Sequence, residues 1–361
     1  MASKRLPELD LLRAVALIGV GVIHGGAWVT PAEAPPGQNA MAAASGLARF
    51  CVPAFVFASG FVLMHTYADR RRDPGAFLRR RWARVLVPWA WCVPLFLLLD
   101  VRRGDPPLTA VGIGRWLAYG PGHLYFLVLM AQLYVVFLLL PRGRKLGWAA
   151  LGLVLVQLAL TAWRTYGRLP GEPLAWPGVF ASPEEAPFWA GTFALGCLAG
   201  AEWPRLRRLD GWWPVAALGS IATAALVLLE GRFVQPGGGL REGSGAYFWP
   251  SHLAQTIAWC MALLWIGCRF QARLEALWSP VRQLSQHSLG IYLLHPAILD
   301  VLGPRTSQLP PALRVPALIA LSFAAAYLAV RLLALTPLTA SIVGEQAPPA
   351  TTKRRLTLSF T

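Results

Sequence analysis

The stretch PELDLLRAVALIGVGVIHGGAWV, residues 7–29, identifies the class of this protein. It is apolar and long enough to cross a hydrocarbon core about 30 Å thick as one helix. It nevertheless contains Arg13 and His24, and charged or ionisable groups inside a membrane helix are functional candidates. The ten residues between them place both on nearly one helix face, about 16 Å apart along the axis. Asp10, three residues before Arg13, lies close to the same face.

The composition extends this interpretation to the whole chain. Of 361 residues, 56% are hydrophobic and 14% are charged, and the mean hydropathy is +0.49. In soluble proteins, about a quarter of all residues are charged. We expect an all-α, polytopic integral membrane bundle of about ten transmembrane helices, because ten apolar runs approach the ~20 residues that a span needs. The runs are 9–30, 46–66, 84–100, 123–140, 146–163, 187–201, 212–230, 247–267, 288–303 and 315–336.

Two of these runs, 187–201 and 288–303, are short and could be tilted, interrupted or re-entrant. We expect a single transmembrane domain over residues 1–340, followed by a short cytoplasmic tail at 341–361, with no appended soluble domain. Any chemistry must then be done by the helix bundle itself.

The net charge of +16 could suggest nucleic-acid binding, but the basic residues are distributed by membrane side. The loops on the side of the N-terminus hold 21 Lys and Arg residues, and the opposite loops hold nine. By the positive-inside rule, both termini are predicted to be cytoplasmic. The partner implied by this charge is the lipid bilayer, and no nucleic acid is expected.

His24 is the leading candidate for a catalytic group. A neutral imidazole in a partly dry cavity can take a proton from a hydroxyl near neutral pH. The alternative is a packed histidine that hydrogen-bonds a neighbouring carbonyl, and a lone intramembrane histidine is compatible with both.

A basic run, RRRWAR at residues 79–84, precedes the third apolar run. Arg81 and Arg84 are three residues apart on one helix face, and guanidinium groups match phosphate oxygens in charge and geometry. With Arg80 beside them, they are candidates for binding an anionic ligand. The alternative is a positively charged anchor that contacts anionic lipid.

Other polar and aromatic residues are candidates for the wall of an internal cavity. Tyr292 and His295 share one face of the run 288–303, His123 and Tyr125 open the run 123–140, and Ser59 lies in the run 46–66. Tyr292 and His295 could equally be an interfacial tyrosine and histidine, and Ser59 a hydroxyl that packs between helices. No cluster of His, Cys and carboxylates has metal-site spacing, and the five cysteines lie in or at the end of apolar runs, so we expect no metal ion.

Taken in order, five segments resemble the acyltransferase 3 family of polytopic membrane acyltransferases. PELDLLRAVALIGVGVIH, at 7–24, is similar to the family's first helix, with its signature of Arg, ten residues and His on Arg13 and His24. CVPAFVFASGFVL, at 51–63, is similar to the second-helix pattern that contains Ser-Gly-Phe. RRRWARVLVPW, at 79–89, matches the signature of Arg, two residues and Arg.

Two further segments complete the resemblance. GHLYFLVLMAQLY, at 122–134, resembles the fourth-helix pattern, although Tyr125 stands where many members have Trp. HSLGIYLLHP, at 287–296, resembles the family's late Tyr and His-Pro segment. Between about 145 and 285 the chain matches the family only in hydropathy.

The resemblance implies transfer of an acyl group, often acetyl, from cytoplasmic acyl-CoA to a hydroxyl of a sugar or related acceptor. Acyl-CoA would be a co-substrate, with no tightly bound cofactor. Arg81 and Arg84 would hold its phosphates, and Arg13, partnered by Asp10, would orient the donor or bear part of its negative charge. His24 would act as the base, or would carry the acyl group covalently.

We expect a bacterial inner (plasma) membrane enzyme that acylates a cell-envelope glycan or a lipid-linked saccharide. Two alternatives stay open. One is a tailoring enzyme that acylates a small metabolite such as a macrolide. The other is a transporter of a lipid-linked sugar, in which Arg13 and His24 couple transport to protons. The absence of a repeat between the two halves of the chain counts against transport.

Overall fold

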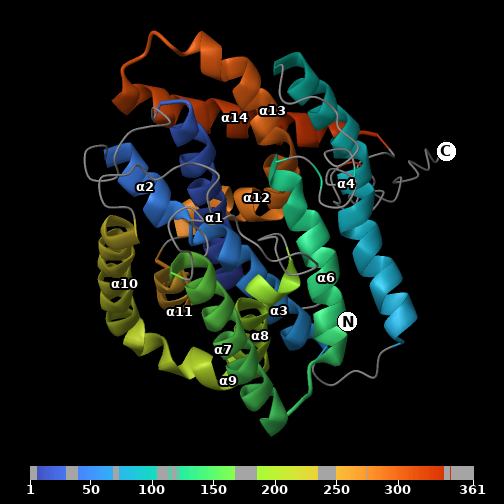
Figure 1. Ribbon diagram of the computed structural model, residues 1–361, viewed down its shortest axis with the longest axis vertical. Helices are drawn as coiled ribbons and strands as arrows, with labels where there is room; N and C mark the ends of the chain where they lie inside the picture. Colours follow the sequence, from blue (N-terminus) through green and yellow to red (C-terminus); the bar gives the residue numbers. More distant parts are fainter. Residues whose placement is uncertain are drawn as a thin grey trace, which may run out of the picture.

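The computed structural model describes residues 6–29, 40–67, 73–103, 114, 120, 122–166, 185–234, 249–273, 275–336 and 342. These residues form helices packed into one bundle, and no β-strand occurs among them (Figure 1). The first half contains α1 (Pro7–Ala27), α2 (Ala40–Ala48), α3 (Cys51–Tyr67), α4 (Pro74–Arg103), the 3₁₀ turn η1 (Gly122–Leu124), α6 (Tyr125–Leu139) and α7 (Arg144–Tyr166). The second half contains η2 (Ala186–Phe188), α8 (Ala190–Ala201), α9 (Trp203–Leu206), η3 (Arg207–Trp212), α10 (Trp213–Val234), α11 (Pro250–Phe270), α12 (Glu275–Gln286), α13 (Ser288–Arg305) and α14 (Pro311–Leu333).

Eight helical segments in the described part are long and apolar enough to cross a membrane, and they contain, in chain order, α1, α3, α4, α6, α7, α10, α11 and α14. The prediction of an all-α polytopic membrane protein is confirmed. The two short runs also form helices. With 12 residues, α8 is about 18 Å long and too short to span the hydrocarbon core. Pro296 and Pro304 interrupt the hydrogen-bond ladder of α13, which is not among the eight.

The number of spans and the side of each terminus stay predictions. Of the expected cytoplasmic tail at 341–361, all but residue 342 lies outside the described residues, as do residues 1–5.

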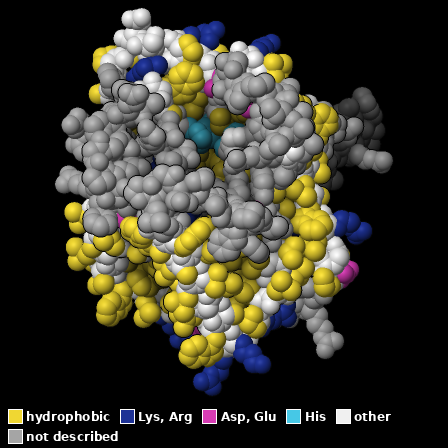
Figure 2. Space-filling model, viewed as in Figure 1, with side chains coloured by type: hydrophobic (Ala, Val, Ile, Leu, Met, Phe, Trp, Pro, Cys, Tyr) yellow, Lys and Arg dark blue, Asp and Glu magenta, His cyan; other side chains and the backbone are white. Residues whose placement is uncertain are grey.

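The outer helices carry the apolar side chains that a lipid environment favours. Trp148 on α7 is 76% exposed, and Leu218 and Ile221 on α10 are 66% and 68% exposed. Hydrophobic side chains cover much of the face shown in Figure 2. Such a surface is typical of helices that face lipid, whereas a soluble monomer rarely exposes large apolar patches.

Helices α3 and α8 pack backbone to backbone in the centre. A Cβ atom at Gly196 would collide with the carbonyl of Phe57, and one at Gly200 would collide with the carbonyl of Phe61. On the facing helix, a Cβ at Gly60 would collide with the carbonyl of Phe193. Small residues four apart permit this close approach between membrane helices. The contact fixes the position of Ser59, next to Gly60 on α3.

The central helix α1 contacts α3, α11, α12, α13 and α14. Gly19 lies against Cys51 of α3, and Gly21 lies against Phe323 of α14. Arg13 and His24 are both half-buried. Because Arg13 and His24 are separated by about three helical turns, they lie in different layers of the bundle.

Candidate active site

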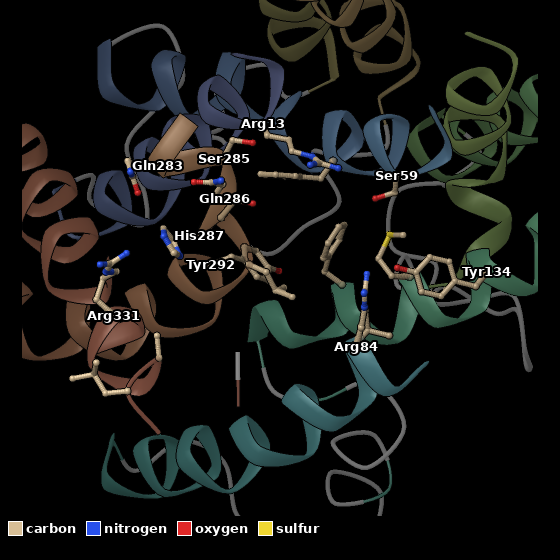
Figure 3. A pocket seen from close by; sticks show the side chains of 18 residues that line it. Arg13, Ser59, Arg84, Tyr134, Gln283, Ser285, Gln286, His287, Tyr292 and Arg331 are labelled. Carbon is tan, nitrogen blue, oxygen red and sulfur yellow. The ribbon is translucent and has the colours of Figure 1, made fainter. Parts of the chain in front are cut away.

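A cavity of about 770 Å³ lies within the bundle, walled by α1, α3, α4, α6, α12, α13 and α14 (Figure 3). One part of its wall is apolar and aromatic, formed by Phe55, Val85, Phe126, Met130 and Leu289. The remainder is polar, and it includes Ser59 and Tyr134 as well as the chain from Gln283 to Ser288, where α12 passes into α13. An elongated ligand with a polar end and an apolar end matches such a lining.

Three arginines on three helices supply the charge of this cavity. Arg13 comes from α1, Arg84 from α4 and Arg331 from α14, and Figure 3 shows them on different sides of the space. His287 adds an imidazole to the same wall. No Asp or Glu is among the described residues that line the cavity. A cluster of guanidinium groups without carboxylates attracts anions, and phosphates in particular.

Asp10 lies beneath this wall and does not itself line the cavity. It is buried, and its Oδ1 accepts a hydrogen bond of 2.7 Å from the hydroxyl of Ser285 on α12. Ser285 is a lining residue, so Asp10 ties α1 to the polar wall beside Arg13. The expectation that Asp10 partners Arg13 stays a prediction.

The arginine side chains of the basic run on α4 lie in different environments. Of its arginines, only Arg84 lines the cavity. Arg81 donates a hydrogen bond of 3.2 Å from Nη2 to the Tyr67 hydroxyl, and its guanidinium lies 5.5 Å from the centroid of that ring. Arg80 is exposed. The structure therefore places one of the three expected anion-binding arginines at the cavity and holds a second against an aromatic ring.

Tyr292 on α13 forms the part of the cavity wall that leads to the histidines. Its hydroxyl donates a hydrogen bond of 2.5 Å to the backbone carbonyl of His123 in η1. Its ring lies 5.1 Å from the ring of His123 and 5.6 Å from that of Phe126, measured between centroids. One side of Tyr292 thus meets the cationic cavity and the other meets His123.

Behind Tyr292, three histidines from three segments form a cluster. The ring centroids of His24 and His295 are 5.1 Å apart, those of His24 and His123 are 6.2 Å apart, and those of His123 and His295 are 6.0 Å apart. All three pairs meet edge to face. Phe96 and Phe323 pack against the outer sides of His123 and His295, respectively.

The three histidines differ in their access to solvent. His123 and His295 are buried, whereas His24 is half-buried. Figure 2 shows histidine atoms, in cyan, at the bottom of a hollow on the face in view. His24, the residue singled out by the first helix, is therefore the most exposed of the three histidines.

The remaining sequence candidates lie as follows. Ser59 lines the cationic cavity, on the side of Tyr134. Tyr125, the first residue of α6, packs half-buried against the hydrophobic core and is not among the residues that line the cavity. The structure thus divides the candidates between a cationic cavity, with Arg13, Arg84, Ser59 and Tyr292, and the histidine cluster beyond it.

Comparison with known protein families identifies the family of this chain. The sequence profile of the acyltransferase 3 family, described as an acyltransferase domain, matches residues 6–331, nearly the whole chain. The chain belongs to this family. It is a membrane acyltransferase, and the matched region contains the histidine cluster and all of the described cavity-lining residues except Ala334 and Leu335. No individual curated protein matches the chain significantly.

Two further arginines of this acyltransferase were not identified as candidates from the sequence. Arg331 lies in the apolar run 315–336 and lines the cavity. Arg49 lies in the run 46–66, at the break between α2 and α3, and is only 7% exposed. The reasoning that singled out Arg13, that an arginine inside an apolar run is a functional candidate, would have found both.

Within the described part of the acyltransferase, no group of three or more His, Cys, Asp or Glu side chains is arranged to hold a metal ion. The histidine cluster of His24, His123 and His295 is no such group either.

Proposed function

We propose that this membrane acyltransferase moves an acyl group, acetyl in the simplest case, from acyl-CoA to a hydroxyl group, with His24 as general base. The observation that carries the proposal is the cavity with Arg13, Arg84 and Arg331 on its walls and no carboxylate among its described lining residues. Tyr292 in its wall packs against His123, and His24 lies beside His123 and His295. One compartment suits a polyanionic donor, and the other suits proton transfer.

The donor compartment fits coenzyme A in charge, size and polarity. Its volume of about 770 Å³ is within the range of about 300–1,000 Å³ typical of ligand sites. The arginines would bind the phosphates, and the apolar wall with Phe126 and Met130 would contact the pantetheine arm. Because the positive-inside rule predicts that the Arg13 end of α1 is cytoplasmic, this compartment would lie on the side where acyl-CoA is present.

The reaction needs one base that is reached from both compartments. His24 would take the proton from the acceptor hydroxyl as the oxygen attacks the thioester carbonyl. The carbon–sulfur bond then breaks, and the CoA thiolate takes the proton from His24. Arg13 lies about 16 Å from His24 along α1, so it would orient the donor through its negatively charged end and would not contact the reacting carbonyl.

For the acceptor, we propose a cell-envelope glycan or a lipid-linked sugar at a bacterial plasma membrane. Half-buried His24 lies about three helical turns along α1 from Arg13, which lines the cationic cavity, and this separation favours an acceptor that arrives from the other side of the membrane. A tailoring reaction on a metabolite such as a macrolide would use the same chemistry with a different acceptor. Membership of an acyltransferase family disfavours the transporter hypothesis.

The first experiment measures thiol release from acetyl-CoA by the purified protein. Dodecyl maltoside serves as detergent and also supplies sugar hydroxyls on an alkyl chain. We expect release by the wild type and none above background by His24→Ala. His65→Ala is the matched control. His65 is also half-buried, but its Nδ1 hydrogen-bonds the backbone carbonyl of Gly200 on α8, which is not part of the histidine cluster. Equal release by wild type and His24→Ala, or none by the wild type with any acyl-CoA, would overturn the proposal.

A further inference from the structure

We infer that His295 is the positioning residue for His24: its Nε2 accepts a hydrogen bond from the imidazole N–H of His24 and so orients the base and stabilises its protonated form. The inference rests on the proposed function, because it assigns the partner of the proposed base. Three properties of His295 support this role: its tautomer, the absence of a hydrogen-bond partner for its Nε2 among the described residues, and its distance from the ring of His24.

The backbone fixes the tautomer of His295. Its Nδ1 lies 3.0 Å from the carbonyl oxygen of Ile291 and 3.0 Å from that of Tyr292. Carbonyl oxygens only accept hydrogen bonds, so Nδ1 must carry the proton. In the neutral ring, Nε2 is then a lone-pair acceptor and cannot donate.

The acceptor atom of His295 is buried and has no hydrogen-bond partner within the described part of the chain. The side chain is fully buried, with an exposed fraction of 0%. A buried polar atom without a partner costs about 1–3 kcal/mol, so such atoms call for an explanation. A hydrogen bond that forms during the reaction supplies one, because the donor N–H is present on the neighbouring ring.

The distances select His295 over His123 as the partner of His24. A ring nitrogen lies roughly 1.1 Å from the centroid, so rings with centroids 5.1 Å apart bring their nitrogens to about 2.9 Å when these point at each other, a normal hydrogen-bond length. For His24 and His123, with centroids 6.2 Å apart, the nitrogens stay about 4 Å apart in the same orientation, beyond hydrogen-bond reach. The rings of His24 and His295 are therefore close enough for a hydrogen bond between their nitrogens, whereas those of His24 and His123 are too far apart.

The bond would act when charge develops. As His24 takes the hydroxyl proton on one nitrogen, its other N–H becomes a charge-assisted donor, and a hydrogen bond to a neutral acceptor strengthens. The proton on His24 passes to the CoA thiolate, and His295 keeps its own proton on Nδ1 throughout. His295 thus has the role of an orienting partner for the base, performed here by a neutral imidazole.

Two nearly isosteric substitutions separate this role from a structural one. In His295→Gln, the side-chain amide reaches the position of Nε2 and can present its oxygen to His24. In His295→Asn, the amide reaches only the position of Nδ1, so it keeps the backbone hydrogen bonds and loses the acceptor. We expect kcat for thiol release from acetyl-CoA to fall about 100-fold or more in His295→Asn, with KM within about threefold of wild type. In His295→Gln, kcat should stay within about tenfold of wild type.

His252 provides the matched control. It is buried, its Nδ1 bonds Gln255 Oε1 at 3.0 Å, and its Nε2 also lacks a partner among the described residues, but it lies outside the histidine cluster. His252→Asn should leave kcat within about threefold of wild type.

The outcomes separate failure of this inference from failure of the proposed function. If the wild type shows no thiol release that depends on His24, the proposed function fails and the inference with it. If the wild type is active and His295→Asn retains its kcat, or exceeds His295→Gln, only the positioning role is refuted. If the His295→Asn protein does not fold, the His295→Gln protein decides: a folded His295→Gln protein with kcat lowered 100-fold or more would refute the positioning role.

Discussion

The hydroxyl oxygen of Tyr292 lies 2.5 Å from the backbone carbonyl oxygen of His123, so a residue of α13 that lines the cationic cavity directly holds the turn that carries one of the three histidines. Three residues after Tyr292, the same helix carries His295. The position of the cavity wall and the geometry of the histidine cluster are therefore coupled through one tyrosine.

Removal of this hydrogen bond should affect turnover more than stability. In Tyr292→Phe the ring packing against His123 and Phe126 remains, and only the hydroxyl is lost. We expect a loss of about 1 kcal/mol of folding free energy and a fall in kcat of about tenfold, because the histidines become less well positioned. Thermal unfolding in detergent and thiol release from acetyl-CoA measure the two effects.

Tyr166→Phe is the control for this prediction. The Tyr166 hydroxyl on α7 donates a hydrogen bond to Glu230 on α10, so its loss should affect stability without affecting turnover. Equal falls in kcat in both variants would argue against the coupling through Tyr292.

Arg331 should contribute to donor affinity. In Arg331→Ala we expect KM for acetyl-CoA to rise about tenfold with kcat nearly unchanged, since a contact to the phosphates is the same in the ground state and the transition state. With acetyl-pantetheine, a donor without the nucleotide and its phosphates, the same substitution should have little effect. Steady-state kinetics with both donors check this.

Arg80→Ala is the matched control, because Arg80 is exposed and does not line the cavity. It should leave KM for acetyl-CoA unchanged. A rise in KM in Arg331→Ala that is equally large with acetyl-pantetheine would show that Arg331 does not act through phosphate.

The close contact of α3 with α8 should be the part of the bundle most sensitive to added volume. In Gly196→Ala, the new methyl group would collide with the backbone carbonyl of Phe57, and the backbone cannot yield as a side chain can. We expect a loss of about 1–3 kcal/mol of stability. Gly152→Ala on α7 is the control, because a Cβ atom there meets nothing within 4 Å and Ala favours the helix. Thermal unfolding of the two variants gives the comparison, and equal stability would contradict the predicted clash.

The orientation in the membrane can be tested by labelling. The positive-inside rule predicts that Arg80 is cytoplasmic and that Leu309, between α13 and α14, lies on the opposite side. A membrane-impermeant maleimide should label Leu309→Cys in intact cells, and Arg80→Cys only after permeabilisation. Four of the native cysteines are buried and Cys268 is partly buried, so the wild type gives the background. The reverse pattern would place the cationic cavity on the outer side.

Several features could be predicted because they depend on residues close together in the chain. The apolar runs predicted the membrane helices, since a span needs only a certain length and hydropathy. The short run 187–201 left a tilted, interrupted or re-entrant element open, and it forms α8, with 12 residues. The placement of Arg13 and His24 on one face follows from helix periodicity alone, and the ordered motifs pointed to the family that the match over residues 6–331 confirms.

The contents of the site depended on how the helices pack. Arg331 lines the same cavity as Arg13 and Arg84, although the three are far apart in sequence. In the same way, the ring of His295 lies beside that of His24. Hydropathy says nothing about which face of α14 or α13 turns inward. That rotation is set by interhelical contacts, such as that of Gly21 on α1 with Phe323 on α14. The same packing turns Arg81 onto Tyr67 and leaves Arg84 at the cavity. Local sequence therefore specifies the helices and their intramembrane polar groups, whereas the three-dimensional packing selects which of those groups form the site, because contacts between distant segments have no signature in either segment alone.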